Sequence, residues 1–130
     1  MKDRLNAISE QIIGAAIDVH REIGPGTLES TCLACLVFEL RRRKLKVERE
    51  VLLPIVYRNQ RIEKAFRLDL MVEDEVIVEV KCVERVHPVH VTQLRSYLRL
   101  SHRKLGLLIN FNVKRVALDG VTRVVNEFPD

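Results

Sequence analysis

The stretch RLDLMVEDEVIVEVK, residues 67–81, decides the fold of this chain. Apolar side chains recur at every second position in each half of the stretch, and this spacing predicts two β-strands, at 67–72 and 76–82. Three acidic residues, Glu73-Asp74-Glu75, separate the two runs and form a short turn. We therefore expect an antiparallel hairpin in which one face is apolar and the other carries charged side chains.

The alternation also fixes the register of this hairpin. Val72 faces Val76 across the turn, and the same register puts Asp69 opposite Glu79. Further predicted pairs are Leu70 with Val78, Met71 with Ile77 and Arg67 with Lys81, and the predicted apolar face consists of Leu68, Leu70, Val72, Val76, Val78, Val80 and Cys82. Two opposed carboxylates repel each other, so a shared proton, a neighbouring cation or a divalent metal ion must offset the repulsion.

Two interpretations of the acidic pair remain open at this point. Asp69, Glu79 and Lys81 form either a salt-bridge network on a solvated sheet face or a site for a hard cation such as Mg²⁺ or Mn²⁺. The continuously apolar run LGLLINF, residues 105–111, favours the second, because a strand buried on both faces implies helices on both sides of the sheet.

The rest of the chain supplies those helices. Helical spacing predicts a helix over 5–23, which Gly24-Pro25-Gly26 ends, and a second helix that Thr27 caps and that continues to Arg43. Glu29 lies on the apolar stripe of the second helix, so its side chain is expected to point inward. The other predicted elements are strands at 47–56, 62–66, 105–111 and 121–125 and a helix at 89–100. Their order predicts an α/β sandwich around a mixed sheet.

Length and composition narrow the classes of protein. The 130 residues predict a single domain, 1–130, and contain no apolar run long enough to span a membrane and no secretory signal. The three cysteines do not suggest a disulfide framework, and Cys32-x-x-Cys35 lies in a helical apolar pattern that favours core packing over a zinc or redox site. These features indicate a cytoplasmic protein.

The net charge of +4 permits a polyanionic partner, and the basic run 41–49 is either a solvated helix end or a phosphate-contacting surface.

Five ordered blocks resemble a known family. They are Gly26-Thr27-Leu28-Glu29-Ser30-Thr31-Cys32, Arg67-Leu68-Asp69-Leu70, Glu79-Val80-Lys81, Gln93-x-x-x-Tyr97-Leu98 and Gly106-Leu107-Leu108-Ile109-Asn110-Phe111. Together they resemble the GxxExxY family of the PD-(D/E)XK nuclease superfamily over residues 10 to 125. Cys32 stands where that family has its name tyrosine. The resemblance implies a restriction-endonuclease-like sandwich with a central mixed sheet flanked by helices.

The resemblance also implies roles for individual residues. Asp69 and Glu79 would hold Mg²⁺ or Mn²⁺ together with the backbone carbonyl of Val80, and Glu29 would contribute directly or through water. Lys81 would orient the attacking water or stabilise the charge that builds on the phosphate. Three residues are expected to touch the substrate: Gln93, which is also a catalytic candidate, Tyr97 and Arg67. For Gln93 and Tyr97 the alternative is a polar helix edge with a tyrosine at the core boundary.

Two hypotheses about function follow from these residues. The first is a metal-dependent nuclease that hydrolyses phosphodiester bonds of DNA, with RNA as the less favoured substrate, acting away from membranes and, by analogy with other compact nucleases, as a homodimer. The second is a catalytically silent module that keeps the nuclease-like fold and binds nucleic acid or a protein.

Overall fold

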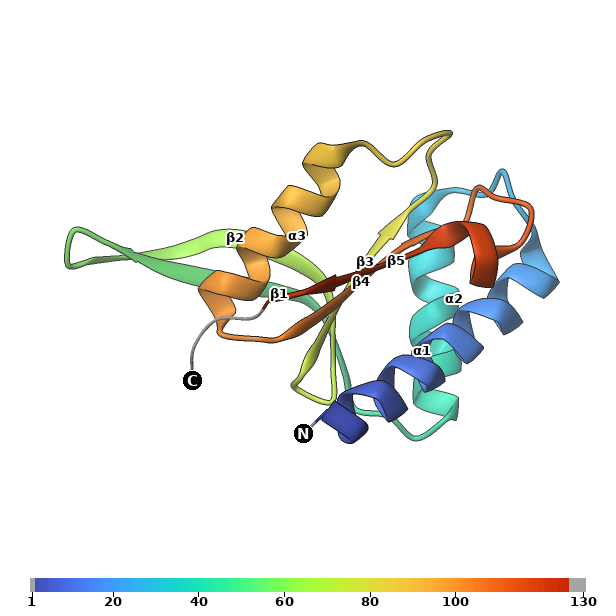
Figure 1. The fold of residues 1–130 in the computed structure, drawn as a ribbon, viewed down its shortest axis with the longest axis horizontal. Helices are drawn as coiled ribbons and strands as arrows, with labels where there is room; N and C mark the ends of the chain where they lie inside the picture. The colour runs from blue at the N-terminus through green and yellow to red at the C-terminus, as the bar shows by residue number, and fades with distance from the viewer. Residues whose placement is uncertain (1, 127–130) are drawn as a thin grey trace.

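The computed structural model describes residues 2–126, in which two helices and three strands are followed by a helix, a strand, a π-helical turn and a last strand (Figure 1). The elements are α1 (Lys2–Ile23), α2 (Glu29–Arg42), β1 (Val47–Tyr57), β2 (Gln60–Val72), β3 (Val76–Lys81), α3 (Pro88–Ser101), β4 (Leu105–Asn110), the π-helical turn η1 (Val116–Gly120) and β5 (Val121–Val125). The predicted strand at 121–125 and the predicted helix at 89–100 are confirmed.

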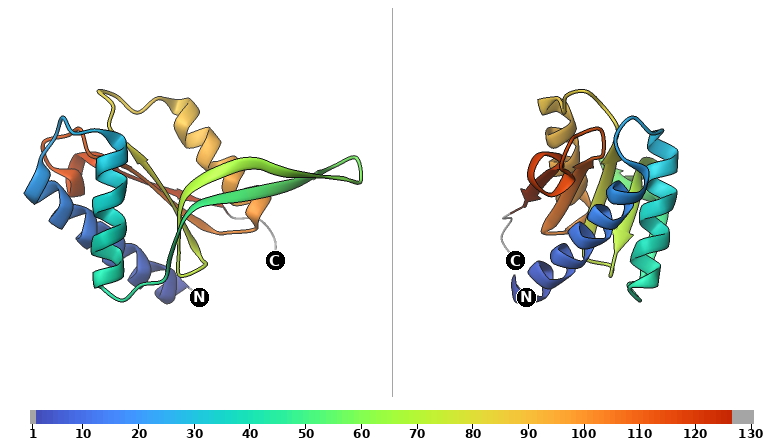
Figure 2. Two further views of the ribbon diagram at one scale, coloured as in Figure 1. Left: turned by 180° about the vertical axis from the view of Figure 1, so that it is seen from behind. Right: turned by 90° about the vertical axis from the view of Figure 1, so that its right-hand side faces the viewer.

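The five strands form one mixed sheet in the order β1-β2-β3-β4-β5. β3 and β4 are parallel, and the other neighbouring pairs are antiparallel. α1 and α2 cover one face of the sheet and α3 lies on the other (Figure 2). All six residues of β4 are buried, as expected of a strand with helices on both sides. The predicted α/β sandwich with a mixed central sheet is therefore confirmed.

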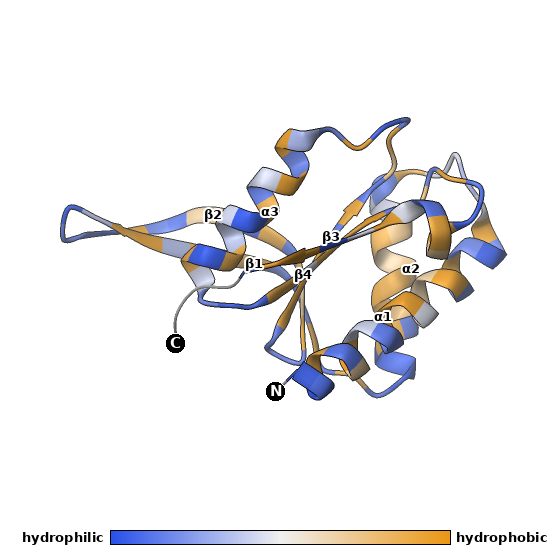
Figure 3. Cartoon of the chain, in the orientation of Figure 1, coloured by the Kyte–Doolittle hydropathy of each residue, from blue (hydrophilic) through white to orange (hydrophobic). Residues whose placement is uncertain are grey.

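Two apolar clusters hold these layers together. The larger joins α1 and α2 to one face of the sheet, and Ile12, Leu36, Val78 and Ile109 are among its fully buried members. The smaller joins α3 to the opposite face through residues such as Leu94. Figure 3 shows the corresponding apolar colour on the strands and on the helix faces that meet them.

The start of α2 differs from the prediction. Thr27 does not cap this helix, because Leu28 precedes its first turn and the Thr27 hydroxyl donates instead to the carbonyl of Ile23 at 3.4 Å. Gly24 and Gly26 end α1 as predicted, with φ angles of +66° and +83° that glycine adopts without strain.

β2 is one strand of 13 residues where the sequence predicted two. Arg58 and Asn59 form the two-residue turn of a long β1–β2 hairpin, with φ angles of +49° and +65°. β3 pairs only with the last three residues of β2, 70–72, so residues 52–67 have no third strand beside them. This two-stranded ribbon, which we call the arm, projects far from the rest of the molecule (Figure 1).

The β2–β3 hairpin follows the predicted register near its turn and departs from it further on. Val72, Met71 and Leu70 pair with Val76, Ile77 and Val78, and there the ladder ends. Asp69 with Glu79 and Arg67 with Lys81 are therefore not ladder partners, which corrects the prediction. The reason is that side-chain carboxylates replace the carbonyl acceptors at this point.

The alternation of faces also breaks at Asp69. Leu68 belongs to the cluster under α3, whereas Leu70 belongs to the cluster under α1 and α2, so the predicted common face of these two leucines was wrong. In the adjacent strand Glu50 has a φ of +54° between the pairs Arg49–Leu70 and Val51–Leu68. This irregularity turns the backbone of β2 where the ladder with β3 stops.

Candidate functional site

Asp69 and Glu79 hold each other's strands through a reciprocal pair of hydrogen bonds. The amide of Asp69 donates to Oε2 of Glu79 at 2.8 Å, and the amide of Val80 donates to Oδ2 of Asp69 at 2.8 Å. The second oxygens, Oδ1 of Asp69 and Oε1 of Glu79, have no hydrogen bond among residues 2–126, and neither is a fully buried orphan atom. Each carboxylate is thus fixed through one oxygen, and its other oxygen has no hydrogen-bond partner in the described part of the chain.

Burial disfavours the charged form of both acids. Burial raises the pKa of Glu79 to about 7, and the charge of Asp69 adds to the shift. Burial also raises the pKa of Asp69, although the Val80 amide and the cations Lys81 and Arg67 oppose this shift. A buried acidic pair of this kind is stabilised by a nearby positive charge.

Lys81 supplies one positive charge beside the pair. It lies at the end of β3, half-buried, and its ammonium group lowers the pKa of both carboxyls. Its backbone carbonyl accepts a hydrogen bond from the amide of Phe111 at 2.9 Å, so Lys81 faces β4 with its main chain. Val80, whose amide binds Asp69, faces β2 instead. Because the amide and carbonyl of one strand residue point to the same side, the Val80 carbonyl lies on the side of the acidic pair.

Asn110 fixes the chain immediately after Lys81. Its side chain is buried, accepts from the amides of Val83 and Asn112, each at 3.1 Å, and donates to the Val83 carbonyl at 2.9 Å. Sequence reasoning assigned no role to this residue. The signal was a single amide at the end of an otherwise apolar buried strand, where a polar group needs partners.

Glu29 does not point inward as the sequence predicted. It is the first residue of α2 and is exposed, because the buried stripe of the helix begins at Cys32, almost one turn later. Glu29 nevertheless acts electrostatically on Glu79, whose pKa it raises slightly in addition to the effects of burial and of Asp69. The loop before it is tied down by a hydrogen bond from the amide of Gly26 to Oδ1 of Asn112 at 3.1 Å.

The three predicted substrate contacts occupy different environments. Gln93 is exposed on α3, and its side chain makes no hydrogen bond to any other residue between 2 and 126. Tyr97 is buried, its ring centroid lies 5.3 Å from that of Phe66, and burial and the charges of Glu79 and Asp69 raise its pKa. Arg67 is exposed two residues before Asp69 and helps to lower the pKa of that acid. The structure brings Tyr97 and Arg67 near the pair and gives no contact for Gln93.

Two further titratable residues lie within electrostatic reach of the site, and sequence reasoning missed both. Glu50, opposite Asp69 on β1, contributes to the raised pKa of Asp69, after burial as the main cause. His90, in the first turn of α3, has a pKa lowered by partial burial and then by Lys81 and His87. Helical and strand spacing could not reveal either, because both depend on which loops and edges meet in space.

The residue that departs from the GxxExxY pattern packs against the end of β3. Cys32 is fully buried, and its Sγ lies 3.3 Å from Sγ of Cys82, the residue after Lys81. Burial and the adjacent Cys82 raise the pKa of the Cys32 thiol to about 12, which keeps it protonated. Core packing, the predicted role of Cys32, is therefore confirmed.

We expect Cys32→Tyr to lower the free energy of unfolding by about 1–3 kcal/mol, because a larger ring at this fully buried position displaces Cys82 and its neighbours. Urea denaturation followed by circular dichroism measures the change. Cys35→Tyr is the matched control, since Cys35 borders an open cavity of about 330 Å³ that can take the ring. Equal stability of Cys32→Tyr and the wild type would show that space for a tyrosine exists beside β3.

The donor atoms fit a hard divalent cation. Two carboxylates with free oxygens and one backbone carbonyl are ligands of the kind that Mg²⁺ and Mn²⁺ take, and Mg²⁺ commonly keeps several waters besides one or two carboxylates. Within residues 2–126, no three His, Cys, Asp or Glu side chains come close enough together to hold a metal ion. Asp69 and Glu79 are thus the two side-chain ligands that the geometry offers, and Glu29 could join them only through water.

The raised pKa of Glu79 predicts how the stability of the metal-free protein depends on pH. An acid with an unfolded pKa near 4.5 and a folded pKa of about 7 binds more protons when folded, so stability decreases as the pH rises between these values. The loss is about 3 kcal/mol. Denaturant titrations of the wild type and Glu79→Gln in EDTA measure it as a difference that grows from pH 4.5 to 7. Glu10→Gln, exposed on α1, is the control, and parallel pH profiles for wild type and Glu79→Gln would contradict the assignment.

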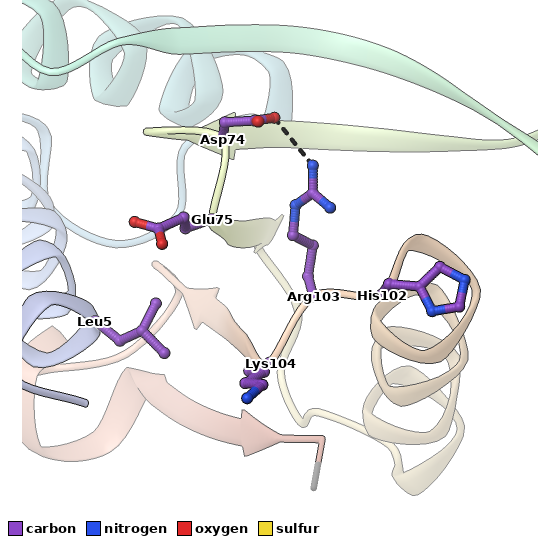
Figure 4. A pocket seen from close by; sticks show the side chains of 6 residues that line it. All are labelled: Leu5, Asp74, Glu75, His102, Arg103 and Lys104. Carbon is purple, nitrogen blue, oxygen red and sulfur yellow. Dashed lines mark hydrogen bonds and ion pairs between the residues drawn. The ribbon is translucent and has the colours of Figure 1, made fainter. Parts of the chain in front are cut away.

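Cavities lie both beside the site and away from it. A cleft of about 410 Å³ follows directly on β3 and is lined by Val83, Glu84, Arg85 and His87. Another cavity, of about 270 Å³, lies at the opposite end of β3 (Figure 4). There Arg103 donates to Asp74 at 3.0 Å, and both side chains line the cavity. The second cavity lies at the start of β3, whereas Glu79 lies near the end of this strand. This cavity is therefore not part of the site around the acidic pair.

Comparison with known proteins places most of the chain in one group. Residues 6–124 match a family described as the PD-(D/E)XK nuclease superfamily. No curated protein and no solved structure matches the chain. No helix within residues 2–126 is long and apolar enough to cross a membrane.

Proposed function

Since the chain belongs to the PD-(D/E)XK nuclease superfamily, we propose that it is a metal-dependent nuclease that hydrolyses phosphodiester bonds of DNA. The observation that carries the proposal is the reciprocal pairing of Asp69 and Glu79 beside Lys81. A buried acidic pair costs stability in the absence of a cation, and a site that binds one offsets this cost. RNA remains the less favoured substrate.

In this proposal Asp69, Glu79 and the Val80 carbonyl hold Mg²⁺ or Mn²⁺, and Glu29 acts through a water molecule. When bound, the ion lowers the pKa of a coordinated water and neutralises phosphate oxygens. The hydrogen bonds from the Asp69 and Val80 amides keep both carboxylates oriented, so little reorganisation is needed on binding. This orientation is a property of the hairpin itself.

Lys81 is proposed to act on the reacting phosphate. Its ammonium group lies near both carboxyls without an ion pair to either, as judged from residues 2–126, so it is free to hold the attacking water or to stabilise negative charge on the phosphate. Arg67 and Tyr97 are proposed to contact substrate at the edge of the site, and Gln93 to reach it from α3.

Finer assignments rest on the five sequence blocks and the composition. We propose that the protein is a member of the GxxExxY family within the superfamily, that residues 1–130 form one domain, and that it acts in the cytoplasm. The three free cysteines support a reducing compartment. A homodimer is proposed because two sites are needed to reach two strands of a duplex.

One observation favours the alternative of a catalytically silent binding module. In the described residues no third acidic side chain joins Asp69 and Glu79, and Glu29 is exposed. A site with two carboxylates holds a metal ion more weakly than one with three. The alternative would retain the fold and bind nucleic acid or a protein without turnover.

Calorimetric titration of Mn²⁺ into the metal-free protein tests the proposal, followed by incubation with plasmid and with single-stranded DNA, each with and without the ion. We expect saturable binding and cleavage that depends on Mn²⁺ or Mg²⁺. Binding without cleavage of either DNA would favour the silent module. The absence of any metal binding would show that the acidic pair is structural.

A further inference from the structure

The arm, residues 52–67, is a surface that the fold leaves without a partner. It consists of the ends of β1 and β2 beyond the reach of β3, and nine consecutive residues, 56–64, are exposed. Apart from Phe66 at its base, it contributes no residue to either core cluster. An isolated two-stranded hairpin is only marginally stable in water. A ribbon of this length that does not support the core is therefore suited to contact another molecule.

The charge of the arm is strongly positive for its size. It carries four cations, Arg58, Arg61, Lys64 and Arg67, against the single carboxylate of Glu63. Its net charge of three is most of the formal +4 of the whole chain. Arg61 pairs with Glu63, but this ion pair is largely exposed and contributes little energy, so a phosphate can displace it.

Several of the six cations in the basic run 41–49 are held by contacts within the fold. In the run 41–49, Arg43 donates to Asp18 at 3.0 Å, and Arg42 pairs with Glu39 at 3.4 Å. Arg41 donates to the carbonyl of Val47 at 3.2 Å. These contacts support the interpretation of that run as a helix end. The arm is therefore the stronger candidate for a contact with a polyanion.

Apolar and aromatic side chains are interleaved with the arm's cations. Val56 and Tyr57 are 71% and 59% exposed, Val56 pairs across the ribbon with Arg61, and the guanidinium of Arg58 lies 5.9 Å from the centre of the Tyr57 ring. Figure 3 shows apolar segments along the ribbon and a hydrophilic tip. A second copy of the chain would bring two positively charged arms together. A nucleic acid instead offers phosphates to the cations and sugars or base methyl groups to the apolar residues.

The arm is also connected directly to the acidic pair. β2 begins with Gln60 next to the tip, and its ten residues up to Asp69 span about 30 Å in an extended strand. This is close to one turn of B-form DNA, and the major groove admits a two-stranded β-ribbon. The tip can thus reach DNA about one helical turn away from a phosphate that lies at Asp69.

We propose that the arm binds in a groove of duplex DNA about one helical turn from the phosphate at the acidic pair. The choice of DNA as the partner rests on the proposed nuclease function. Arg58, Arg61 and Lys64 contact phosphates on both sides of the groove, and Tyr57 and Val56 contact the groove itself. The arm supplies affinity and preference for duplex, whereas the residues around Asp69 supply the chemistry.

Fluorescence anisotropy in EDTA tests this proposal without any cleavage, with a labelled 30-base-pair duplex and the corresponding single strand as probes. The test variant is the triple substitution Arg58→Gln, Arg61→Gln, Lys64→Gln. We expect its Kd for the duplex to rise at least tenfold and the slope of log K against log salt to decrease by about 2–3, because each lost phosphate contact removes about 0.9. Binding of the single strand should weaken much less.

The matched control removes three exposed cations that line a cavity beside α1 and η1, outside the arm, Arg21→Gln, Lys114→Gln and Arg115→Gln. Equal weakening by the two triples, unchanged binding by the arm triple, or equal loss on single strand and duplex would each overturn the proposal. So would a wild-type dimer in sedimentation that the arm triple converts to a monomer, since the arm would then be a subunit interface. Mn²⁺ titration of the arm triple is expected to match the wild type, which separates this result from a failure of the proposed metal site.

Discussion

Asp69→Asn is expected to abolish Mn²⁺ binding in calorimetry and to reduce DNA cleavage by about a thousandfold or more. The asparagine keeps an oxygen that accepts the hydrogen bond from the Val80 amide, so the hairpin retains its geometry while one negative charge is lost. Alanine would remove this acceptor as well and would combine a defect in folding with a defect in metal binding. The isosteric change therefore tests the charge alone.

The same substitution should also stabilise the metal-free protein above pH 7, because it ends the repulsion between Asp69 and Glu79. Gain of thermal stability together with loss of metal binding is a combination that a merely structural ion pair would not give. Asp74→Asn, at the exposed turn of the same hairpin, is the control. Retained cleavage in Asp69→Asn would remove this residue from the proposed site.

Lys81→Ala is expected to reduce the single-turnover rate of cleavage by about a hundred- to a thousandfold while Mn²⁺ still binds. The lysine carries the positive charge nearest to the acidic pair, and it supplies no ligand oxygen. Its removal has two opposing effects on the affinity for the ion, because it raises the pKa of both carboxyls and also removes a repelling cation. The affinity should therefore change by less than about tenfold.

The single-turnover rate is measured at saturating Mn²⁺, and the dissociation constant for Mn²⁺ is measured by calorimetry. Both are compared between Lys81→Ala and the wild type. Lys81→Arg keeps the charge and should restore part of the rate, whereas Lys114→Ala, exposed and far along the chain, should behave as the wild type. Full activity of Lys81→Ala would contradict the role assigned to the ammonium group. Loss of both rate and metal binding would assign Lys81 to the folding of the site.

The central elements were predictable because their signals are local. Alternation in 67–81 predicts β2 and β3 near their turn, the apolar run at 105–111 predicts the buried strand β4, and helical spacing predicts α1 and α2. The proximity of Asp69 and Glu79 also followed from the register, although the ladder ends at Leu70 and Val78, before the predicted pairs Asp69–Glu79 and Arg67–Lys81. The spacing of the apolar residues and the identity of the turn residues were sufficient to predict these elements.

The features that were not predicted depend on contacts between distant segments. The prediction that Glu29 points inward was wrong, because the apolar stripe of a helix does not indicate at which residue the helix first contacts the sheet. Leu68 changed face because Glu50, on another strand, adopts a left-handed backbone conformation. The continuity of β2 between Phe66 and Arg67 was missed because it depends on pairing with another strand, in which Leu53 and Leu52 of β1 face these two residues. A sequence pattern of one segment contains none of this information.

The reciprocal hydrogen bonds of Asp69 and Glu79 couple the assembly of the site to the folding of the β2–β3 hairpin. Two main-chain amides end on acidic side chains of the opposite strand, so β2 and β3 cannot close fully at this end until both acids are in position. Assembly of the site and closure of the hairpin belong to one cooperative unit of folding. Hydrogen exchange at the amides of Asp69 and Val80 consequently reports on the integrity of the site in the whole protein, without substrate and without a bound ion.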